Sequence, residues 1–427
     1  RIDDISELTG LDDSGMEAIL EGEDVDDLYD PEGSKIVQLV NKIILKAVQE
    51  DSSDIHIEPM KGKTPGVVRM RVDGVCRKVF DIPSTLMRSV VARIKILSNL
   101  DISERRKPQD GKMTLKMGQA SLELRVATLP CVCGESAVLR ILAQGEALPY
   151  DKLNLSERNY HLIKEKIVIP HGLFLVVGPT GSGKTTTLHA VLALLNTEER
   201  KVLTAEDPVE ITQNGLQQVQ MLPKAGLTFA SAMRSFLRCD PDVILIGEMR
   251  DEETAETGVE ASLTGHMVFS TLHTNSASET VIRLLDMGLD PMNFGDALVG
   301  ILAQRLMRTL CGTCKEPYIA EAEEIDAITH YYGEEYIGEL NIDWTTHELQ
   351  RAVGCDKCDH TGYRGRTGIH EFLVATPPMK KLVAHSSPVP VLVEQAMKDG
   401  MRTLKQDGTQ KVINGLSDLT QLKRVAH

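Results

Sequence analysis

Residues 178–185 read GPTGSGKT and fit the pattern G-x-x-x-x-G-K-[S/T]. The apolar run 173–177 directly before them is typical of a parallel strand that is buried on both faces. Apolar residues recur at i, i+3, i+4 and i+7 from Leu188, which predicts a helix with one apolar face. A glycine loop between strand and helix points backbone N–H groups into a concavity that holds polyphosphate. The sequence therefore predicts a nucleotide site rather than an ordinary glycine-rich turn.

The residues of this loop have separate expected roles. Lys184 is expected to reach the β- and γ-phosphates of ATP, and the Thr185 hydroxyl is expected to take a coordination position on Mg²⁺. The other residues expected to contact the nucleotide here are Gly178, Pro179, Thr180, Gly181, Ser182, Gly183 and Thr186. ATP and Mg²⁺ are therefore the expected cofactors.

Length and charge limit the classes of protein to which this chain can belong. A chain of 427 residues is long enough for two or three domains. Its net charge of −15 argues against a nucleic-acid partner, because binding to nucleic acid is driven by neutralisation of phosphates. No run approaches the eighteen or so apolar residues of a membrane span, and no signal peptide is recognised. We therefore expect a cytoplasmic protein with no direct membrane span.

The sequence before the glycine loop predicts two segments. Residues 1–33 are expected to form an acidic, solvated linker with at most short helices, because residues 1–32 carry thirteen acidic side chains and one basic one. Residues 34–148 are expected to form an α+β domain with helices on an antiparallel sheet. The patterns predict helices from residue 35 and at 84–97, strands at 53–58, 67–72, 122–127 and 136–141, a turn at 73–74 followed by a further strand, and a polar loop at 104–111.

Residues 149–427 are expected to form a P-loop domain of the α/β class. Three further apolar runs predict core strands at 201–205, 242–248 and 267–272, and apolar spacing at 229–237 predicts a helix. Each of these runs is followed by acidic or polar residues. The carboxyl ends of parallel strands are where such sheets bind ligands, so these residues are candidates for the site.

Several of these residues are candidates for hydrolytic chemistry. Glu248 ends an apolar strand, and because Gly247 stands where an aspartate is usual, Glu248 is interpreted as the base that positions water. Glu206 and Glu210, with Asp207, could hold Mg²⁺ through its waters, or form a solvated turn. Glu210 is a second candidate for the base.

Two histidines flank the strand predicted at 267–272. His266 and His273 could sense the γ-phosphate or pair with carboxylates. Structural hydrogen-bonding roles remain the alternative for both side chains.

Two C-x-x-C pairs predict a metal site. Cys311 and Cys314 form one pair, and Cys355 and Cys358 form the other. Four thiolates in two such pairs suit tetrahedral Zn²⁺ with no open position, which indicates a structural metal. His360 would be a redundant ligand. The remaining cysteines, at 76, 131, 133 and 239, are interpreted as scattered small side chains.

Taken together, the motifs resemble those of the secretion ATPase superfamily, and more narrowly its GspE/PilB branch, the motors of type II secretion and type IV pilus assembly. The resemblance runs from about Ser34 to the C-terminus. The segments that carry it are residues 53–58 and 71–74, the glycine loop, the acidic segment 206–210, residues 240–251, residues 264–275 and the two C-x-x-C pairs.

This resemblance implies a RecA-like catalytic domain, preceded by a PAS-like α+β domain called N2. It also implies a zinc-binding insert at about 305–370 and a helical part at 371–427. The family forms ring hexamers in which ATP lies between N2 and the catalytic domain. Arginines complete that site, and by motif position they are Arg125 and Arg140 in N2 and Arg234 and Arg238 before the strand at 242–248. For each arginine the alternative is a surface charge or salt bridge.

The resemblance also implies partners and a location. The motor is expected to act at the inner face of the cytoplasmic membrane, through an inner-membrane platform and assembly proteins. Three alternatives stay open: a pilus-retraction motor, a DNA-translocating ATPase and a scaffold without motor activity. The C-x-x-C pairs argue against the first alternative, and Glu248 argues against the third. The second alternative would need a basic channel, and its binding to DNA should then fall steeply with salt.

Overall fold

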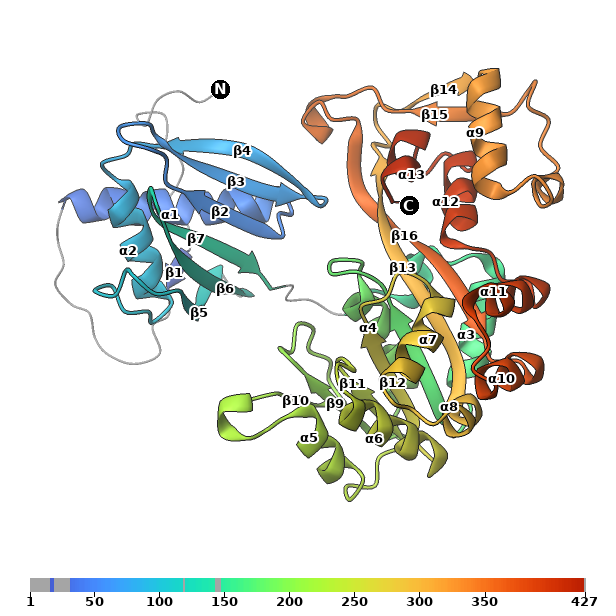
Figure 1. Ribbon diagram of the computed structural model, residues 1–427. Helices are drawn as coiled ribbons and strands as arrows, with labels where there is room; N and C mark the ends of the chain where they lie inside the picture. The colour runs from blue at the N-terminus through green and yellow to red at the C-terminus, as the bar shows by residue number, and fades with distance from the viewer. Residues whose placement is uncertain (1–15, 19–30, 118–119, 143–146, 426–427) are drawn as a thin grey trace. The chain divides into compact units, whose positions relative to one another are not determined.

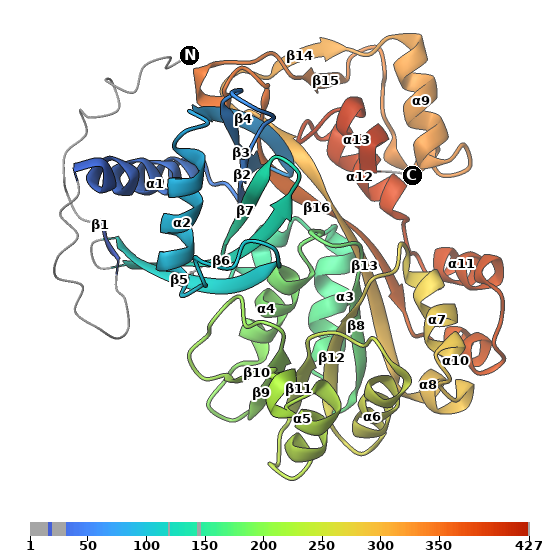
Figure 2. The ribbon, with the colours of Figure 1, turned by 60° about the vertical axis from the view of Figure 1, so that its left-hand side comes forward.

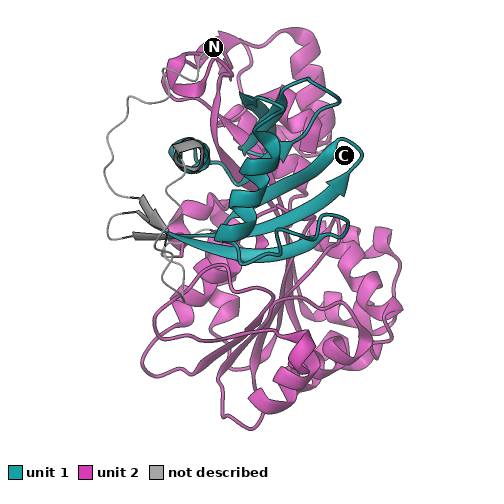
Figure 3. Cartoon of the chain, turned by 90° about the vertical axis from the view of Figure 1, so that its left-hand side faces the viewer, with its two compact units in different colours: residues 1–144 teal, residues 145–427 magenta. Residues whose placement is uncertain are grey.

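The computed structural model describes residues 16–18, 31–117, 120–142 and 147–425. The chain divides into two compact units, residues 1–144 and 145–427, which Figure 3 shows in different colours. Most of the predicted acidic linker, residues 1–15 and 19–30, lies outside the described residues. Within that stretch the structure describes a three-residue strand, β1 (Met16–Ala18).

The first unit is an antiparallel sheet with two helices, as its sequence predicts (Figure 1). The strand order is β1-β5-β6-β7-β2-β3-β4. The helices are α1 (Pro31–Gln49) and α2 (Met87–Leu97). The strands after β1 are β2 (Asp54–Glu58), β3 (Gly66–Val72), β4 (Val75–Ile82), β5 (Gln109–Met117), β6 (Ala120–Cys131) and β7 (Gly134–Ile141).

Buried apolar side chains alternate with more exposed ones along the strands of this unit, and the buried ones form a single core. Ile55 and Ile57 on β2 are buried, as are Val68 and Met70 on β3, and they pack with the apolar faces of both helices. Side chains at the intervening positions point to the opposite face of the sheet, because successive residues of a strand alternate. That opposite face carries the arginines considered below.

One sequence-based expectation in this unit is wrong. Residues 104–111 were predicted as a polar loop, but Gln109–Gly111 already belong to strand β5. Their polarity is compatible with a strand because β6 pairs with them, as Gln109 lies opposite Thr128 and Gly111 opposite Val126. Pairing with a distant segment therefore determines the structure here, and the local pattern contains no sign of it.

The second unit is built on a sheet of the order β10-β9-β11-β12-β8-β13-β16. All neighbours are parallel except β13 and β16, which are antiparallel. The strands are β8 (Gly172–Val177), β9 (Val202–Glu206), β10 (Gln217–Gln220), β11 (Val243–Ile246), β12 (Met267–Leu272), β13 (Leu298–Leu310) and β16 (Tyr363–Val374). The strands predicted at 201–205, 242–248 and 267–272 are confirmed as β9, β11 and β12.

Helices cover both faces of this sheet, so it has two cores (Figure 2). Helices α3 (Glu157–Ile167) and α4 (Lys184–Leu195) cover one face. Helices α5 (Phe229–Phe236), α6 (Glu252–Leu263), α7 (Ala277–Asp286) and α8 (Pro291–Ala297) contribute to the other. Strand β8 is buried at every position, with Leu175 in one core and Phe174 in the other, as expected of a central parallel strand.

Strands β13 and β16 form a long antiparallel ribbon that leads to a small module (Figure 1). The module contains the two-stranded sheet β14 (Glu316–Ile319) and β15 (Glu348–Arg351), with helix α9 (Ala322–Tyr332). After β16 the chain forms four helices, α10 (Pro377–Ala384), α11 (Val389–Lys398), α12 (Leu404–Ile413) and α13 (Leu419–Val425). Among the described residues no helix combines the length and hydropathy needed to cross a bilayer.

The core of the first unit makes a testable prediction. Leu139 on β7 is fully buried, so Leu139→Ala should lower the free energy of unfolding of this unit by about 2–5 kcal/mol, through lost transfer free energy and the cavity left behind. The check is amide hydrogen exchange of β2 and β7. Leu129→Ala is the matched control, because Leu129 on β6 is 53% exposed and its loss should change stability by less than about 0.5 kcal/mol. Equal effects of the two changes would contradict this description of the core.

Candidate nucleotide site and metal centre

The glycine loop joins β8 to α4, in the context that the sequence predicts. Gly178, Gly181 and Gly183 have φ angles of 152°, 77° and 84°, in the region that favours glycine. A Cβ at Gly178 would lie 2.3 Å from the carbonyl oxygen of Gln304, and one at Gly183 would lie 2.9 Å from Nε2 of the same residue. The first and last of these glycines are thus required both for backbone conformation and for close packing on β13.

The loop has donors suited to a phosphate. Lys184, near the end of the loop, begins α4, so the free N–H groups of the first helical turn adjoin the loop. Ser182 is buried, and within the described part of the chain its Oγ has no hydrogen-bond partner. A buried hydroxyl without a partner is uncommon, and a phosphate oxygen is an acceptor that would satisfy it. The residues present therefore fit a bound polyphosphate.

Lys184 lies against the loop and near two acidic side chains. Its Nζ donates to the carbonyl oxygens of Gly178 at 2.8 Å and Pro179 at 3.2 Å, and lies 3.5 Å from Nδ1 of His273. Burial lowers the pKa of Lys184, while the charges of Glu248 and Glu210 oppose that shift. Glu248 and Glu210 are thus close enough to act electrostatically on the lysine of the loop.

Glu248 is held between two basic side chains. Its carboxylate lies 3.2 Å from Nε2 of His273 and 2.7 Å from Nη2 of Arg250. The other ring nitrogen of His273, Nδ1, faces Lys184. Lys184, His273 and Glu248 therefore form one chain of contacts beside the loop. Sequence reasoning gave Arg250 no role, although it lies in a recognised motif. Its contact with Glu248 is the observation that assigns it to the site.

Glu206 lies in a buried hydrogen-bond network. It accepts from Thr204 and Gln218 and pairs with the buried His189 of α4 at 3.1 Å. Burial raises the pKa of Glu206, but hydrogen bonds from His189, Thr204 and Gln218 outweigh burial, so the pKa lies below its ordinary value. The structure thus gives Glu206 internal partners, whereas Glu210 of the same segment is exposed.

His266 is not brought to the glycine loop. It precedes β12, whereas His273 follows it, and seven steps of about 3.3 Å along the strand separate the two histidines by about 23 Å. β12 is parallel to β8, so the loop and His273 lie at the carboxyl edge of the sheet and His266 at the amino edge. There its Nδ1 lies 2.9 Å from the carbonyl oxygen of Ala261.

Arg234 and Arg238 have partners outside the glycine loop of their own chain. Arg234 is exposed and pairs with Glu253 of α6, and Arg238 donates to the carbonyl oxygen of Arg234. The next residue, Cys239, accepts a hydrogen bond from Lys201, which directly precedes β9. Within one chain the two arginines therefore make the surface contacts that the sequence left as the alternative.

Arg125 and Arg140 lie directly opposite each other on β6 and β7 of the first unit. Both are exposed, and Arg140 donates from Nε to Asp54 at 2.8 Å. Asp54 also lies 3.6 Å from Nε of Arg71, and Lys112 lies opposite Arg125. Residues that lie directly opposite one another on paired strands share one face of the sheet. Lys112, Arg125, Arg140, Asp54 and Arg71 therefore form a row of four basic side chains and one acidic one. The assignment of Arg125 and Arg140 to the nucleotide stays a prediction.

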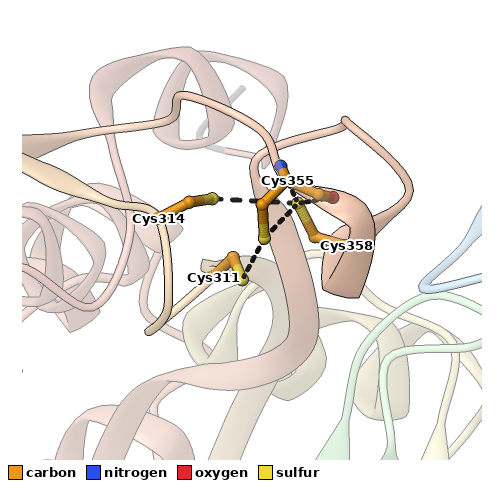
Figure 4. Close-up of side chains that lie close together, drawn as sticks. All are labelled: Cys311, Cys314, Cys355 and Cys358. Carbon is orange, nitrogen blue, oxygen red and sulfur yellow. Dashed lines mark hydrogen bonds between the residues drawn. The ribbon is translucent and has the colours of Figure 1, made fainter.

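The four cysteines of the C-x-x-C pairs converge at the end of the β13–β16 ribbon (Figure 4). Their sulfur atoms all lie within 4.8 Å of one another, and three separations are 4.0, 3.8 and 3.8 Å. A tetrahedral zinc ion with Zn–S bonds of about 2.3 Å requires sulfurs about 3.8 Å apart, whereas a disulfide requires about 2.05 Å. The geometry thus fits one zinc ion and excludes disulfides among the four.

Backbone donors around the sulfurs also favour a metal. N–H groups of Cys355 and Gly362 donate to Sγ of Cys358, both at 3.2 Å, and that of Gly354 donates to Sγ of Cys314. Burial raises the pKa of Cys358, but these donors and the neighbouring thiols outweigh burial and lower it to about 6. The cluster is therefore suited to hold a thiolate, which is the form that binds zinc.

Comparisons with known proteins identify the family. A family model described as "Type II/IV secretion system protein" matches residues 30–424. The type II secretion system protein E of Pseudomonas aeruginosa is 44% identical over 405 residues, which cover 94% of this chain and 78% of the relative. The chain belongs to the type II/IV secretion system protein family.

Two further matches support the same placement of this secretion ATPase. The type IV pilus assembly ATPase PilB of Pseudomonas aeruginosa is 41% identical over 425 residues, which cover 98% of this chain and 73% of PilB. The X-ray structure of the ATPase DotB from Legionella pneumophila has a TM-score of 0.68 at 21% identity, covering 91% of this chain and 95% of that one, which shows a shared fold. The GspE/PilB resemblance and the fold class predicted from the sequence are confirmed, and so is the interpretation as an ATPase.

The metal centre of this secretion ATPase gives a prediction that needs no assumption about the motor. Cys311→Ser or Cys358→Ser should lower the zinc content from about one ion per chain and weaken the module at 311–362, because metal binding stabilises the fold that gathers the ligands. The measurement is metal stoichiometry by mass spectrometry, with thermal unfolding before and after chelation. Cys239→Ser, at an exposed cysteine outside the cluster, is the control. A metal-free wild type with an unchanged melting curve would exclude the site.

Proposed function

We propose that this ATPase is a ring-hexamer motor that hydrolyses Mg-ATP to drive pilin or pseudopilin filament assembly, in type IV pilus assembly or type II secretion. The observation that carries the proposal is the chain of contacts Lys184–His273–Glu248 beside the glycine loop. It combines a cation that can bind the phosphates, Lys184, with a carboxylate that can orient a water molecule, Glu248. Membership of the family, with relatives named as secretion and pilus assembly proteins, supports the choice of pathway.

The proposal assigns a role to each residue of the site. Lys184 and the N–H groups of the loop bind the β- and γ-phosphates, and Thr185 contributes its hydroxyl to Mg²⁺, which neutralises charge on the phosphates. Glu248 orients the attacking water, and its carboxylate is positioned for this by His273 and Arg250. Glu210 contributes negative charge at the same edge of the sheet. Arg125, Arg140, Arg234 and Arg238 supply positive charge at sites completed in the assembled ring.

We propose the following division of the chain: an acidic linker at 1–33, an N2 domain at 34–148 and a catalytic domain at 149–427. The four cysteines hold one structural zinc ion in an insert at about 305–370. The motor acts at the inner face of the cytoplasmic membrane through an inner-membrane platform protein. Deleting the gene tests the pathway, since loss of a pilus and loss of a secreted enzyme distinguish the two systems. Intact piliation and secretion in the deletion strain would contradict the proposal.

The role of Glu248 is tested by an isosteric change. Glu248→Gln keeps the size and hydrogen bonding of the side chain but removes the charge that orients water, so ATP should bind while turnover falls by about 10²-fold or more. Nucleotide affinity and steady-state phosphate release are measured together. Glu260→Gln, at an exposed glutamate of α6, should leave both unchanged. Normal hydrolysis by Glu248→Gln would transfer the role to another carboxylate, with Glu210 the first candidate.

The arginines of the first unit are tested through the split between rate and affinity. Arg125→Ala and Arg140→Ala should lower kcat more than they raise KM, because their charge acts mainly on the transition state. Asp54 keeps Arg71 as a partner when Arg140 is removed, so the fold should survive. Arg105→Ala, at an exposed arginine of the same unit, is the control. A loss of ATP affinity at an unchanged maximal rate would reassign the two arginines to ground-state binding.

A further inference from the structure

Gln304 on β13 contacts the glycine loop and its helix at once. The side chain is buried, with 3% of its surface exposed. Its Oε1 accepts a hydrogen bond from the Thr187 hydroxyl of α4 at 2.6 Å, and its Nε2 donates to the carbonyl oxygen of Ser182 at 2.7 Å. One amide thus joins the phosphate loop, the first turn of the following helix and the central sheet.

The bond to Ser182 determines the direction of a backbone donor. The Ser182 carbonyl and the Gly183 N–H belong to one planar trans peptide, in which C=O and N–H point in opposite directions. Because Gln304 holds the carbonyl toward β13, the Gly183 N–H points away from β13. Among the described residues this N–H has no protein acceptor. It is thus available to a phosphate oxygen, as the N–H groups of such loops are.

The loop needs this restraint because its glycines give it conformational freedom. Gly183 has a φ of 84° and Gly181 has a φ of 77°, and glycine populates both signs of φ with little difference in free energy. Rotation of the Ser182–Gly183 peptide would turn its carbonyl toward the phosphates and its N–H away. The hydrogen bond from Gln304 opposes that rotation, since a rotated peptide would leave the buried Nε2 without its acceptor.

We propose that Gln304 is a positioning residue for nucleotide binding, which sets the Ser182–Gly183 peptide so that its N–H donates to the phosphates. This inference rests on the proposed function, because it assumes that the loop binds polyphosphate. It adds a residue on β13, 120 positions beyond Lys184 in the sequence, to those that shape the phosphate site. Gln304 itself touches the loop and not the nucleotide.

The test replaces Gln304 with residues of similar size. Gln304→Met removes both hydrogen bonds, and Gln304→Glu keeps an acceptor for Thr187 but loses the donor to Ser182. Each should raise the dissociation constants of ADP and ATP by about tenfold or more. The reason is that the Gly183 N–H would no longer be held toward the phosphates, and its hydrogen bond to a charged phosphate oxygen would be lost. At saturating ATP the change in kcat should be smaller than the change in KM. The substitutions should change the melting temperature of the nucleotide-free protein less than they change the rise in melting temperature that nucleotide produces.

Two controls separate positioning from general packing. Gln406→Met removes another buried glutamine, which donates to the carbonyl oxygen of Tyr332 at 2.8 Å away from the loop, and should leave nucleotide affinity unchanged. Thr187→Val removes the bond to α4 and keeps that to Ser182, so it should affect affinity less than Gln304→Met.

The outcomes distinguish this inference from the proposed function. Wild-type affinities for ADP and ATP in folded Gln304→Met would overturn the positioning role. If that variant does not fold, Gln304→Glu decides in the same way. Lys184→Ala tests the phosphate site itself: if it loses nucleotide while both Gln304 variants bind normally, only the positioning role fails. If Lys184→Ala bound nucleotide with wild-type affinity, both the positioning role of Gln304 and the proposed function would be contradicted.

Discussion

The close contact between the glycine loop and β13 is the constraint on which the second unit depends. Gly178 lies so near the carbonyl oxygen of Gln304 that a Cβ there would be 2.3 Å from it. The loop therefore cannot be built on β8 and α4 alone, although these two elements define its sequence pattern. A neighbouring strand supplies the surface against which the loop is formed, and a side chain of that strand fixes one of its peptides. The phosphate site is thus a property of three elements.

The same strand leads directly to the metal centre. β13 ends at Leu310, Cys311 follows, and the pairing of Leu310 with Tyr363 brings the second cysteine pair alongside the first. On β16 the buried carboxylate of Glu371 accepts hydrogen bonds from the N–H groups that begin α7 and α12, Ala277 at 2.9 Å and Leu404 at 3.4 Å. The ribbon β13–β16 therefore connects the nucleotide site, the cysteine module and the C-terminal helices through direct contacts.

Much of this arrangement was predicted from the sequence, and the omissions have physical reasons. Strands β8, β9, β11 and β12 are apolar throughout, so their sequence alone identifies them as buried parallel strands. β13 was missed because polar residues interrupt its apolar pattern. Gln304 is satisfied by the loop and Arg305 donates to the carbonyl oxygen of Val425, so their partners lie in distant segments.

The candidate site shows the same division between local and tertiary information. Glu248 and His273 each follow an apolar strand, and the parallel sheet brings them to within 3.2 Å of each other, as strand ends predict. His266 precedes the same strand, so its position at the opposite edge was already implied by the six residues between the two histidines. The burial of Glu206 could not be read from the sequence, because its partner His189 lies on a different element.

The glycine at position 247 has a steric explanation that bears on the chemistry. A Cβ at Gly247 would lie 3.0 Å from the carbonyl oxygen of Ala205 and 3.4 Å from Cα of Glu206, because β11 and β9 approach closely at their carboxyl ends. A side chain at this position would require these neighbouring atoms to shift by about a few tenths of an ångström. The first carboxylate after β11 is that of the next residue, Glu248, which lies between His273 and Arg250. Glycine at 247 therefore suits the close approach of the two strand ends, and Glu248 is the acid that follows β11 at the site.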